Sequence, residues 1–304
     1  MRAWDPEQTV DPDRARTLLR RQFPELADAP MRTAGAGWDA TVIQVDGRWA
    51  FRFPRREVAV PLLEREIELL PRLAPNVPLP IPEPRWIGAP DEDFPWPWFG
   101  GQYLPGRELA AAAGPADDER GALAGGLGRF LRELHASRLR SRLGAFLPFD
   151  PNRRADMAFR VASTRERIAR LAADGIWQSP PEVERLLRDA GGLPPSPHVA
   201  LLHGDLHARH VLVDDVGRPT GIIDWGDACL GDPAIDLAIA YAAFVGEPRA
   251  GMFDAYGRRP DRLTELRGRV VAVSLSATLL EYAVDAGLEA LRDEMARSLG
   301  RAVA

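Results

Sequence analysis

The stretch Leu201–Ala228 reads LLHGDLHARHVLVDDVGRPTGIIDWGDA and decides the fold. Its apolar start predicts a strand that leads into a polar loop with Asp205 at the tip. Val211–Val213 and Gly221–Ile223 predict the two strands of a hairpin, because turn-forming residues separate them. A second carboxylate, Asp224, ends the returning strand. Since the strands of a hairpin lie side by side, we expect both carboxylates near the same mouth.

Two acids near one mouth are the arrangement that phosphoryl transfer needs. One carboxylate can orient a hydroxyl group, and the other can hold a divalent ion. The reaction depends mostly on positioning the reactants and neutralising charge, so few other groups are required.

Two segments of this stretch together resemble the aminoglycoside phosphotransferase family of antibiotic kinases, which are relatives of protein kinases. They are His203–His207 (HGDLH) and Ile222–Gly226 (IIDWG), with the two acids nineteen residues apart. The resemblance implies an α+β, bilobal protein-kinase-like fold: a small antiparallel-sheet lobe over residues 1–101, a hinge over 102–106 and a larger, mainly helical lobe over 107–304. It also implies roles for the acids. Asp205 would accept the proton of a substrate hydroxyl as it attacks the γ-phosphate, and Asp224 would bind Mg²⁺, a hard cation that prefers oxygen.

Composition agrees with an ordinary globular enzyme. The 304 residues favour two lobes, and they contain no apolar run long enough to span a membrane and no N-terminal apolar signal core. We therefore expect a cytoplasmic monomer without membrane or nucleic-acid partners, and a single buried thiol at Cys229. The basic residues are all arginine, and the net charge of −5 arises entirely within residues 203–304. This acidic segment could attract a cationic substrate or could be solvated helix faces.

The strand Trp49–Phe53 is the informative part of the first lobe. Its alternation puts Ala50 and Arg52 on one face, where the small residue leaves room for a flat base and the guanidinium reaches towards phosphates. The pattern resembles the Ala-x-Lys of kinases, with arginine in the position of lysine. Glu66 falls within the apolar stripe of the next helix, where a buried carboxylate needs a partner. We expect it to pair with Arg52, as the family resemblance implies.

The segment Gln102–Gly106 resembles the hinge between kinase lobes. There the backbone carbonyl of Gln102 and the amide of Leu104 would contact the edge of the nucleotide base. The remaining periodicity predicts a leading helix, strands in the first lobe and helices in the second. The expected helices are 11–23, one starting near 61, 117–137, 156–173, 181–190, 232–244, 266–286 and 288–299, and the expected strands are 31–35, 40–45, 48–53 and 85–88.

Three further residues complete the predicted catalytic loop. His203 is interpreted as a structural anchor of the loop. Asp236, on an apolar helix, is expected from the family to brace the loop backbone. His210 stands where most of the family has asparagine, and imidazole is a poorer Mg²⁺ ligand than a carboxamide oxygen. The sequence HGDLHxxH and the segment Phe51–Pro54 are similar to the macrolide phosphotransferase branch, and this similarity favours a macrolide acceptor and GTP.

The acceptor stays open at this point. A macrolide carries one amine on a large apolar ring and would need few acids, whereas a polyamine sugar would use several. The acids that could bind such a sugar are Asp227, Asp232, Glu281, Asp285 and Glu289.

Three alternatives to a macrolide kinase remain. An aminoglycoside phosphotransferase, or a kinase of another small alcohol such as a sugar, choline or homoserine, would keep every motif. A nucleotide-binding pseudoenzyme is the third, because Arg52 and His210 both replace expected groups. ATP in place of GTP fits each alternative as well.

Overall fold

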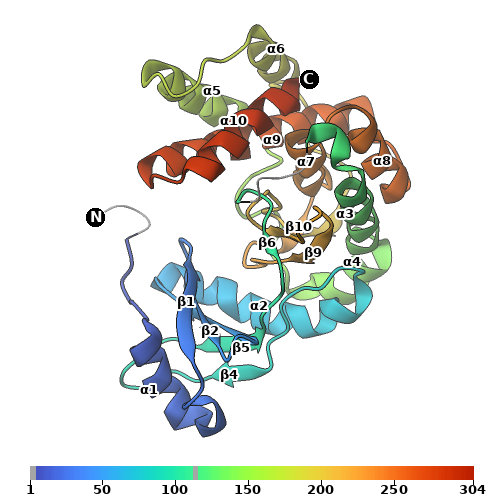
Figure 1. The fold of residues 1–304 in the computed structure, drawn as a ribbon. Coiled ribbons are helices and arrows are strands. Elements are labelled where there is room, and N and C mark those ends of the chain that lie inside the picture. The colour runs from blue at the N-terminus through green and yellow to red at the C-terminus, as the bar shows by residue number, and fades with distance from the viewer. Residues whose placement is uncertain (1–4, 112–115) are drawn as a thin grey trace. The chain divides into compact units, whose positions relative to one another are not determined.

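The computed structural model describes residues 5–111 and 116–304, and these form two compact units. The first comprises the chain up to Asn76 together with Pro80–Leu104, and the second comprises Val77–Leu79 and Pro105–Ala304. The division after Leu104 falls inside the segment predicted as the hinge. One unit is built on a sheet and the other mainly on helices (Figure 1), which confirms the predicted α+β class.

An antiparallel sheet with the strand order β1-β2-β3-β5-β4 forms the first unit. Asp46 and Gly47 both have positive φ, 55° and 65°, at the turn between β2 and β3. This is the backbone of a type I′ turn, which matches the twist of a hairpin. The strands are β1 Met31–Ala36, β2 Ala40–Val45, β3 Trp49–Pro54, β4 Trp86–Gly88 and β5 Trp98–Gln102.

Aromatic side chains fill the core under this sheet. Phe51 and Phe53 of β3 are fully buried, and the Phe53 ring lies 5.0 Å from that of Trp98 between centroids. Helix α1 (Pro12–Gln22), which Asp11 caps by accepting from Arg14 N, packs Leu18 and Leu19 into the same cluster. Phe94 and Trp98, which lie in the aromatic run Phe94–Phe99 ahead of the hinge, belong to this cluster as well. Helix α2 (Val60–Leu73) buries Glu66 along with its leucines.

Eight helices are described in the second unit. The predicted ones are present, but α4 and α8 were not expected: α8 contains two glycines and a proline, which are poor helix formers. The helices are α3 Gly121–Leu134, α4 Ser137–Leu143, α5 Met157–Ala173, α6 Pro181–Ala190, α7 Ala234–Ala243, α8 Gly246–Tyr256, α9 Arg262–Asp285 and α10 Glu289–Val303. Short 3₁₀ turns occur at Pro24–Leu26, Glu57–Ala59, Ala74–Asn76, Asp117–Glu119 and Gly144–Phe146.

Helix α7 lies at the centre of this unit, with α9 and α10 packed against it (Figure 1). Nearly all of its side chains are buried, which explains why its sequence is apolar on every side. Among the described residues, no helix combines the length and apolar character needed to cross a membrane.

Two small sheets hold the loops of the second unit. β7 (Ala200–Leu202) pairs with β10 (Cys229–Gly231), and β8 (Val211–Val213) pairs with β9 (Pro219–Ile222) and β6 (Arg107–Glu108). The hairpin predicted from the sequence is thus formed by β8 and β9. Its position fixes where the two predicted catalytic acids emerge.

Candidate active site

Asp205 and Asp224 both emerge from the small sheets of the second unit. Asp205 follows β7 after a turn at Gly204, and Asp224 follows β9 directly. Asp224 has φ 66°, a left-handed conformation that costs a non-glycine residue about 1–3 kcal/mol. Its side chain is 44% exposed, whereas that of Asp205 is 20% exposed.

The His210 imidazole brings the two acids together. Its Nδ1 lies 2.8 Å from the carbonyl oxygen of Asp205, and its Nε2 lies 3.4 Å from Oδ2 of Asp224. Both carboxylate-bearing residues therefore flank one ring, which confirms that the predicted pair converges on one place.

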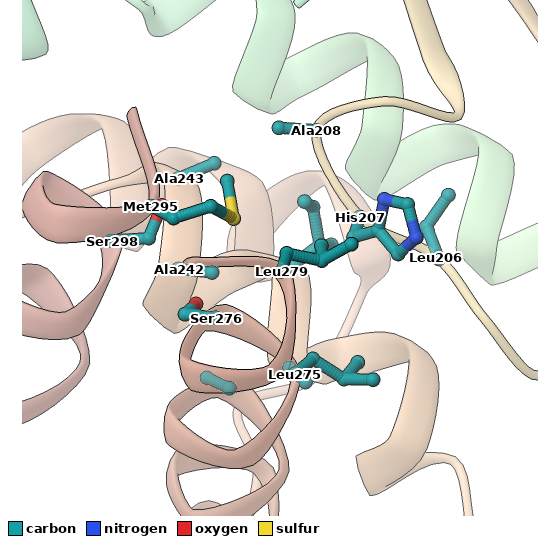
Figure 2. Close-up of a pocket in the computed structure, with 13 residues that line it drawn as sticks. Leu206, His207, Ala208, Ala242, Ala243, Leu275, Ser276, Leu279, Met295 and Ser298 are labelled. Carbon is teal, nitrogen blue, oxygen red and sulfur yellow. The ribbon is translucent and has the colours of Figure 1, made fainter. Parts of the chain in front are cut away.

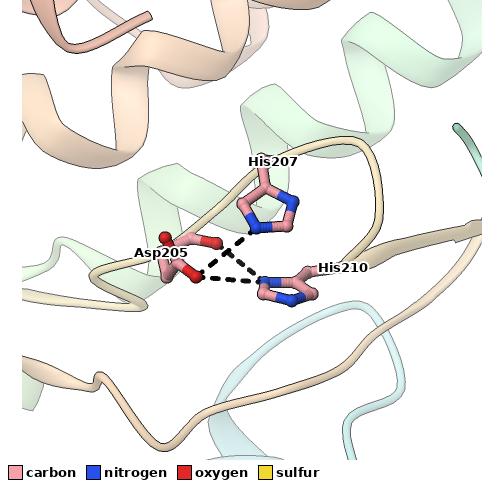
Figure 3. A group of neighbouring side chains, drawn as sticks. All are labelled: Asp205, His207 and His210. Atoms are coloured by element: carbon pink, nitrogen blue, oxygen red, sulfur yellow. Dashed lines mark hydrogen bonds and ion pairs between the residues drawn. The ribbon is translucent and has the colours of Figure 1, made fainter. Parts of the chain in front are cut away.

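Hydrogen bonding fixes the tautomers of the two neighbouring histidines. Because a carbonyl oxygen can only accept, Nδ1 of His210 carries the proton and donates to Asp205 O. His207 Nδ1 accepts from Arg209 N at 3.3 Å, so its Nε2–H faces Oδ2 of Asp205 at 3.4 Å. Figure 3 shows both imidazoles turned towards Asp205.

These tautomers decide where a metal ion fits. The ligand atoms of Asp205, His207 and His210 lie within 4.8 Å of one another, but the nitrogens that face the carboxylate carry protons, so this group is a hydrogen-bonded cluster. Burial lowers the pKa of His210 to about 4, so its Nε2 presents a lone pair to the Asp224 carboxylate. A divalent cation would satisfy both atoms. The residues present therefore fit a cation at His210 Nε2 and Asp224.

Asp236 on α7 braces the backbone of the catalytic loop, as the sequence predicts. Its fully buried carboxylate accepts from His203 N at 2.8 Å, from Gly204 N at 3.0 Å and from His135 Nε2 at 3.1 Å. Gly204 has φ 84°, and a Cβ there would lie 2.2 Å from the carbonyl oxygen of Asp227, so only glycine fits. Asp236 therefore holds the loop through hydrogen bonds to two consecutive backbone amides.

His203 connects the two motifs. Its Nε2 donates to the carbonyl of Ile223 at 3.0 Å, and its Nδ1 accepts from Asp205 N at 3.2 Å. Burial lowers the pKa of His203, so the ring stays neutral. A structural anchor, the role predicted for His203, would make contacts of this kind.

One charged partner of the site was not expected from the sequence. Arg154 lies in the loop before α5, and its Nη2 is 2.6 Å from Oδ1 of Asp205 and 3.2 Å from Oδ2 of Asp227. Burial alone would raise the pKa of Asp205, but the facing Arg154 guanidinium and His207 hold that pKa well below its usual range. Burial, reinforced by the neighbouring Asp205 charge, raises the pKa of Asp227 in spite of Arg154.

Three of the five acids named for a polyamine substrate lie beside arginines, whereas Asp285 and Glu289 are exposed. Asp227 faces Arg154, and Glu281 on α9 bonds Arg167 and Arg170 of α5 at 2.9 and 3.1 Å. The expectation for Asp232 was wrong: it is 3% exposed, caps α7 at Ala234 N and lies 3.6 Å from Arg267. An inward-facing carboxylate beside an arginine is not open to a substrate.

The first unit contains the predicted strand-to-helix ion pair. Arg52 Nε lies 3.3 Å from Oε2 of Glu66, and both side chains are largely buried. In the sheet, Ala50 lies opposite Gly101 and Trp49 lies opposite Gln102. The ion pair is confirmed, while the nucleotide contacts of Ala50, Arg52, Gln102 and Leu104 stay predictions.

A small apolar pocket lies behind the catalytic loop (Figure 2). Residues Leu206–Ala208 face side chains of α7, α9 and α10, including Leu279 and Met295. Its volume of about 10 Å³ is at the lower limit for one water molecule, so the pocket as it stands does not admit a drug-sized acceptor.

The single cysteine, Cys229, lies on β10. Burial raises the pKa of its thiol to about 12, which keeps this thiol protonated and unreactive.

Solved structures that share this fold include antibiotic kinases. The GDP and kanamycin complex of APH(2")-IIIa superposes with a TM-score of 0.70 at 23% identity, covering 94% of this chain and 97% of that one. The macrolide 2'-phosphotransferase MphH from Brachybacterium faecium has a TM-score of 0.61 at 25% identity, covering 94% and 98%.

Sequence relatives match over shorter segments. Viomycin phosphotransferase from Streptomyces vinaceus is 38% identical over 115 residues, 36% of this chain and 37% of that protein. The uncharacterized protein YcbJ from Bacillus subtilis is 38% identical over 64 residues, 21% of each chain. The model of the phosphotransferase enzyme family matches residues 30–269, most of the chain and both catalytic motifs. Together with the convergent acids, this match shows that the chain belongs to the phosphotransferase enzyme family.

Proposed function

We propose that this protein is a small-molecule kinase that transfers the γ-phosphoryl group of GTP or ATP to a hydroxyl of an antibiotic, with a macrolide as the preferred acceptor. The observation that carries the proposal is the arrangement of Asp205 and Asp224 on either side of one neutral imidazole. Under this proposal the enzyme works in the cytoplasm as a monomer.

Each residue of the catalytic loop has one task in this reaction. Asp205 accepts the proton of the acceptor hydroxyl and aligns its oxygen for attack. Asp224 and His210 Nε2 would hold Mg²⁺, which would supply charge neutralisation at the phosphates. Asp236 and His203 keep the loop backbone in place, so the base does not have to be ordered again in each cycle.

The nucleotide roles belong to the first unit and its connection. Arg52, held by Glu66, binds phosphate oxygens through its planar fork, which can serve where kinases use lysine. Ala50 leaves space for the base, and the backbone of Gln102 and Leu104 reads its edge. GDP and ATP are named in complexes of structural neighbours, which supports a nucleotide co-substrate.

The macrolide preference rests on charge. Asp227 and Glu281, two acids that a polyamine could use, already contact arginines, and Asp232 is buried. A polycationic sugar would have to displace these arginines, whereas an acceptor with a single amine would not. Similarity to a macrolide 2'-phosphotransferase at 25% identity points the same way.

An aminoglycoside acceptor is the second candidate. The specific observation in its favour is the TM-score of 0.70 with APH(2")-IIIa, which exceeds that with the macrolide enzyme. A cyclic-peptide antibiotic is included in the test, because viomycin phosphotransferase is a sequence relative.

One screen tests these assignments. Purified protein is incubated with Mg²⁺ and either GTP or ATP, together with macrolides, aminoglycosides, viomycin and simple alcohols, and products are read by mass spectrometry. We expect phosphorylated macrolide, and none with the Asp205→Ala variant. Phosphorylation of aminoglycosides alone would select the second candidate. Nucleotide binding without transfer to any compound would overturn the kinase assignment and favour the pseudoenzyme.

A further inference from the structure

Arg154 contacts the catalytic carboxylate directly, and the proposed mechanism gives it no task. We propose that Arg154 is a positioning residue for phosphoryl transfer: it holds one oxygen of Asp205 and thereby presents the other oxygen to the acceptor hydroxyl. This inference rests on the proposed function and adds a requirement to it.

The contacts of Arg154 are short and poorly hydrated. A single nitrogen, Nη2, is 2.6 Å from Oδ1 of Asp205 and 3.2 Å from Oδ2 of Asp227, and the Arg154 side chain is only 13% exposed. Charge-assisted hydrogen bonds of this length are roughly twice as strong as neutral ones. Two carboxylates this near each other repel unless a cation lies between them. The guanidinium therefore fixes the direction of the Asp205 side chain.

The second oxygen of Asp205 is held more loosely. Oδ2 lies 3.4 Å from His207 Nε2 and 3.8 Å from His210 Nδ1, and the latter proton is directed at the Asp205 carbonyl instead. With Oδ1 bound to Arg154, Oδ2 is the atom that can accept a proton from a substrate. Arg154 thus distinguishes two oxygens that are chemically equivalent in a free carboxylate.

Hydrogen bonds within the loop around Arg154 hold this residue in place beside Asp205. Asp150 accepts from Arg154 N at 2.7 Å and from Ala155 N at 2.9 Å, and its own amide donates to the carbonyl of Leu230 in β10. Asn152 Nδ2 donates to Oδ1 of Asp227 at 3.0 Å. The loop is thereby attached to β10, which pairs with β7 ahead of Asp205, and to the acid that Arg154 also contacts.

Backbone strain in this loop supports a functional reason for its shape. Asp150 and Arg153 have φ of 30° and 51°, a region that non-glycine residues rarely occupy. Such residues cost about 1–3 kcal/mol each and persist where the surroundings enforce them. Here the enforcing contacts are the hydrogen bonds that aim Arg154 at Asp205.

The effect of Arg154 on the position of the Asp205 carboxylate is larger than its effect on the basicity of that carboxylate. A guanidinium beside a carboxylate weakens it as a base, which would slow a reaction limited by proton abstraction. Phosphoryl transfer passes through a loose transition state in which alignment matters more than base strength. A misplacement of about 1 Å can lower the rate roughly 100-fold, so fixing the carboxylate is the larger effect.

Substitution of Arg154 tests this role. In Arg154→Ala and Arg154→Gln we expect kcat to fall about 100-fold with the acceptor that the wild type uses, while the KM for nucleotide stays within about twofold. Arg154→Lys should recover part of kcat, because it restores the positive charge without the fork. The control is Arg153→Ala, whose exposed side chain pairs with Asp156 and stacks on the ring of Phe159; it should match the wild type.

The outcomes separate this inference from the proposed function. If the wild type transfers phosphate and Arg154→Ala does so equally well, the positioning role is wrong. A faster Arg154→Ala enzyme would also overturn it, because Arg154 would then be a latch that restrains Asp205. Thermal unfolding of each variant shows whether it is folded; if Arg154→Ala is not, the folded Arg154→Gln variant decides, and kcat at the wild-type value in that variant contradicts the positioning role. Absence of transfer by the wild type would instead refute the proposed function.

Discussion

His210 makes the requirement for metal ions testable at a single residue. Its Nε2 lone pair lies 3.4 Å from Asp224 Oδ2, so His210→Ala removes one ligand and leaves the carboxylate. We expect the Mg²⁺ concentration for half-maximal rate to rise at least tenfold, since loss of even outer partners of a metal site costs about 10–100-fold. His210→Asn should restore the requirement for Mg²⁺ to near the wild-type value, because it supplies a carboxamide oxygen. A rate titration with Mg²⁺ measures this, and an unchanged requirement in His210→Ala would exclude His210 as a ligand.

Among single residues, the sequence predicted those that lie in motifs with a recognisable spacing along the chain. The pair Asp205 and Asp224 and the anchor His203 stand in two short motifs of one contiguous stretch, Leu201–Ala228. Arg154 could not be predicted, because it reaches Asp205 from a loop 51 positions away and only the fold brings them together. Asp232 was placed wrongly for the same reason: its partner Arg267 lies on a helix that sequence cannot place beside it.

Helix α3 shows how one element depends on glycine in two different ways. A Cβ at Gly128 would lie 2.3 Å from the carbonyl oxygen of Met252 on α8, whereas a Cβ at Gly125 would meet only the end of the flexible Arg129 side chain at 3.4 Å. Gly128→Ala should therefore lower the free energy of unfolding by about 1–3 kcal/mol through overpacking. Gly125→Ala should raise it by up to ~1 kcal/mol through helix propensity. Urea unfolding of the two variants compares them, and equal stabilities would contradict the close α3–α8 contact.

Helix α10 is attached to the rest of the second unit by a buried carboxylate. Glu294 is 2% exposed; its Oε1 accepts from Arg301 at 2.8 Å and from Arg120 at 3.2 Å, and Arg301 also bonds Asp117. In Glu294→Gln these arginines lose a buried counter-charge, and we expect a loss of about 3 kcal/mol in the free energy of unfolding at neutral pH. Glu182→Gln, in an exposed pair on α6, is the control and should change stability by less than ~0.5 kcal/mol.

The Glu294 carboxylate makes the free energy of unfolding depend on pH, and the direction of this dependence follows from the shift of its pKa. Burial raises the pKa of Glu294, but Arg301 and Arg120 outweigh it, so its folded pKa lies below the ordinary 4.5. Its contribution is therefore fully present above about pH 4.5 and is lost as the pH falls through the folded pKa. The stability difference between wild type and Glu294→Gln should shrink on acidification below pH 4.5. A difference that stays constant down to pH 3 would show that packing, not charge, is responsible.

Helices and strands were predictable where their sequence has a clear apolar pattern, either along one face or on every side. α7 and α9 bury long apolar runs, and the β2–β3 hairpin has the Asp46-Gly47 turn. α8 was missed because its glycines and proline argue against a helix, and packing against other elements, mostly α3, stabilises it. Tertiary packing overrides intrinsic propensity in such segments.

For the molecule as a whole, the family assignment predicts that nucleotide binding and catalysis can be separated by mutation. Asp205 orients the acceptor in the proposed mechanism, so Asp205→Ala should lose about 10²–10⁴-fold in kcat while nucleotide still binds. Asp224 holds the metal, so Asp224→Ala should lose both transfer and the Mg²⁺-dependent part of nucleotide binding. A ligand at 100 times its Kd stabilises the folded protein by about 2.7 kcal/mol, which thermal unfolding detects readily. We therefore expect GTP or ATP with Mg²⁺ to raise Tm in the wild type and in Asp205→Ala, and to raise it much less in Asp224→Ala.

If Asp205→Ala also loses the Tm shift, Asp205 binds nucleotide or metal instead of the acceptor. If all three proteins show the same shift and the wild type transfers no phosphate, the chain binds nucleotide without using it, as a pseudoenzyme would.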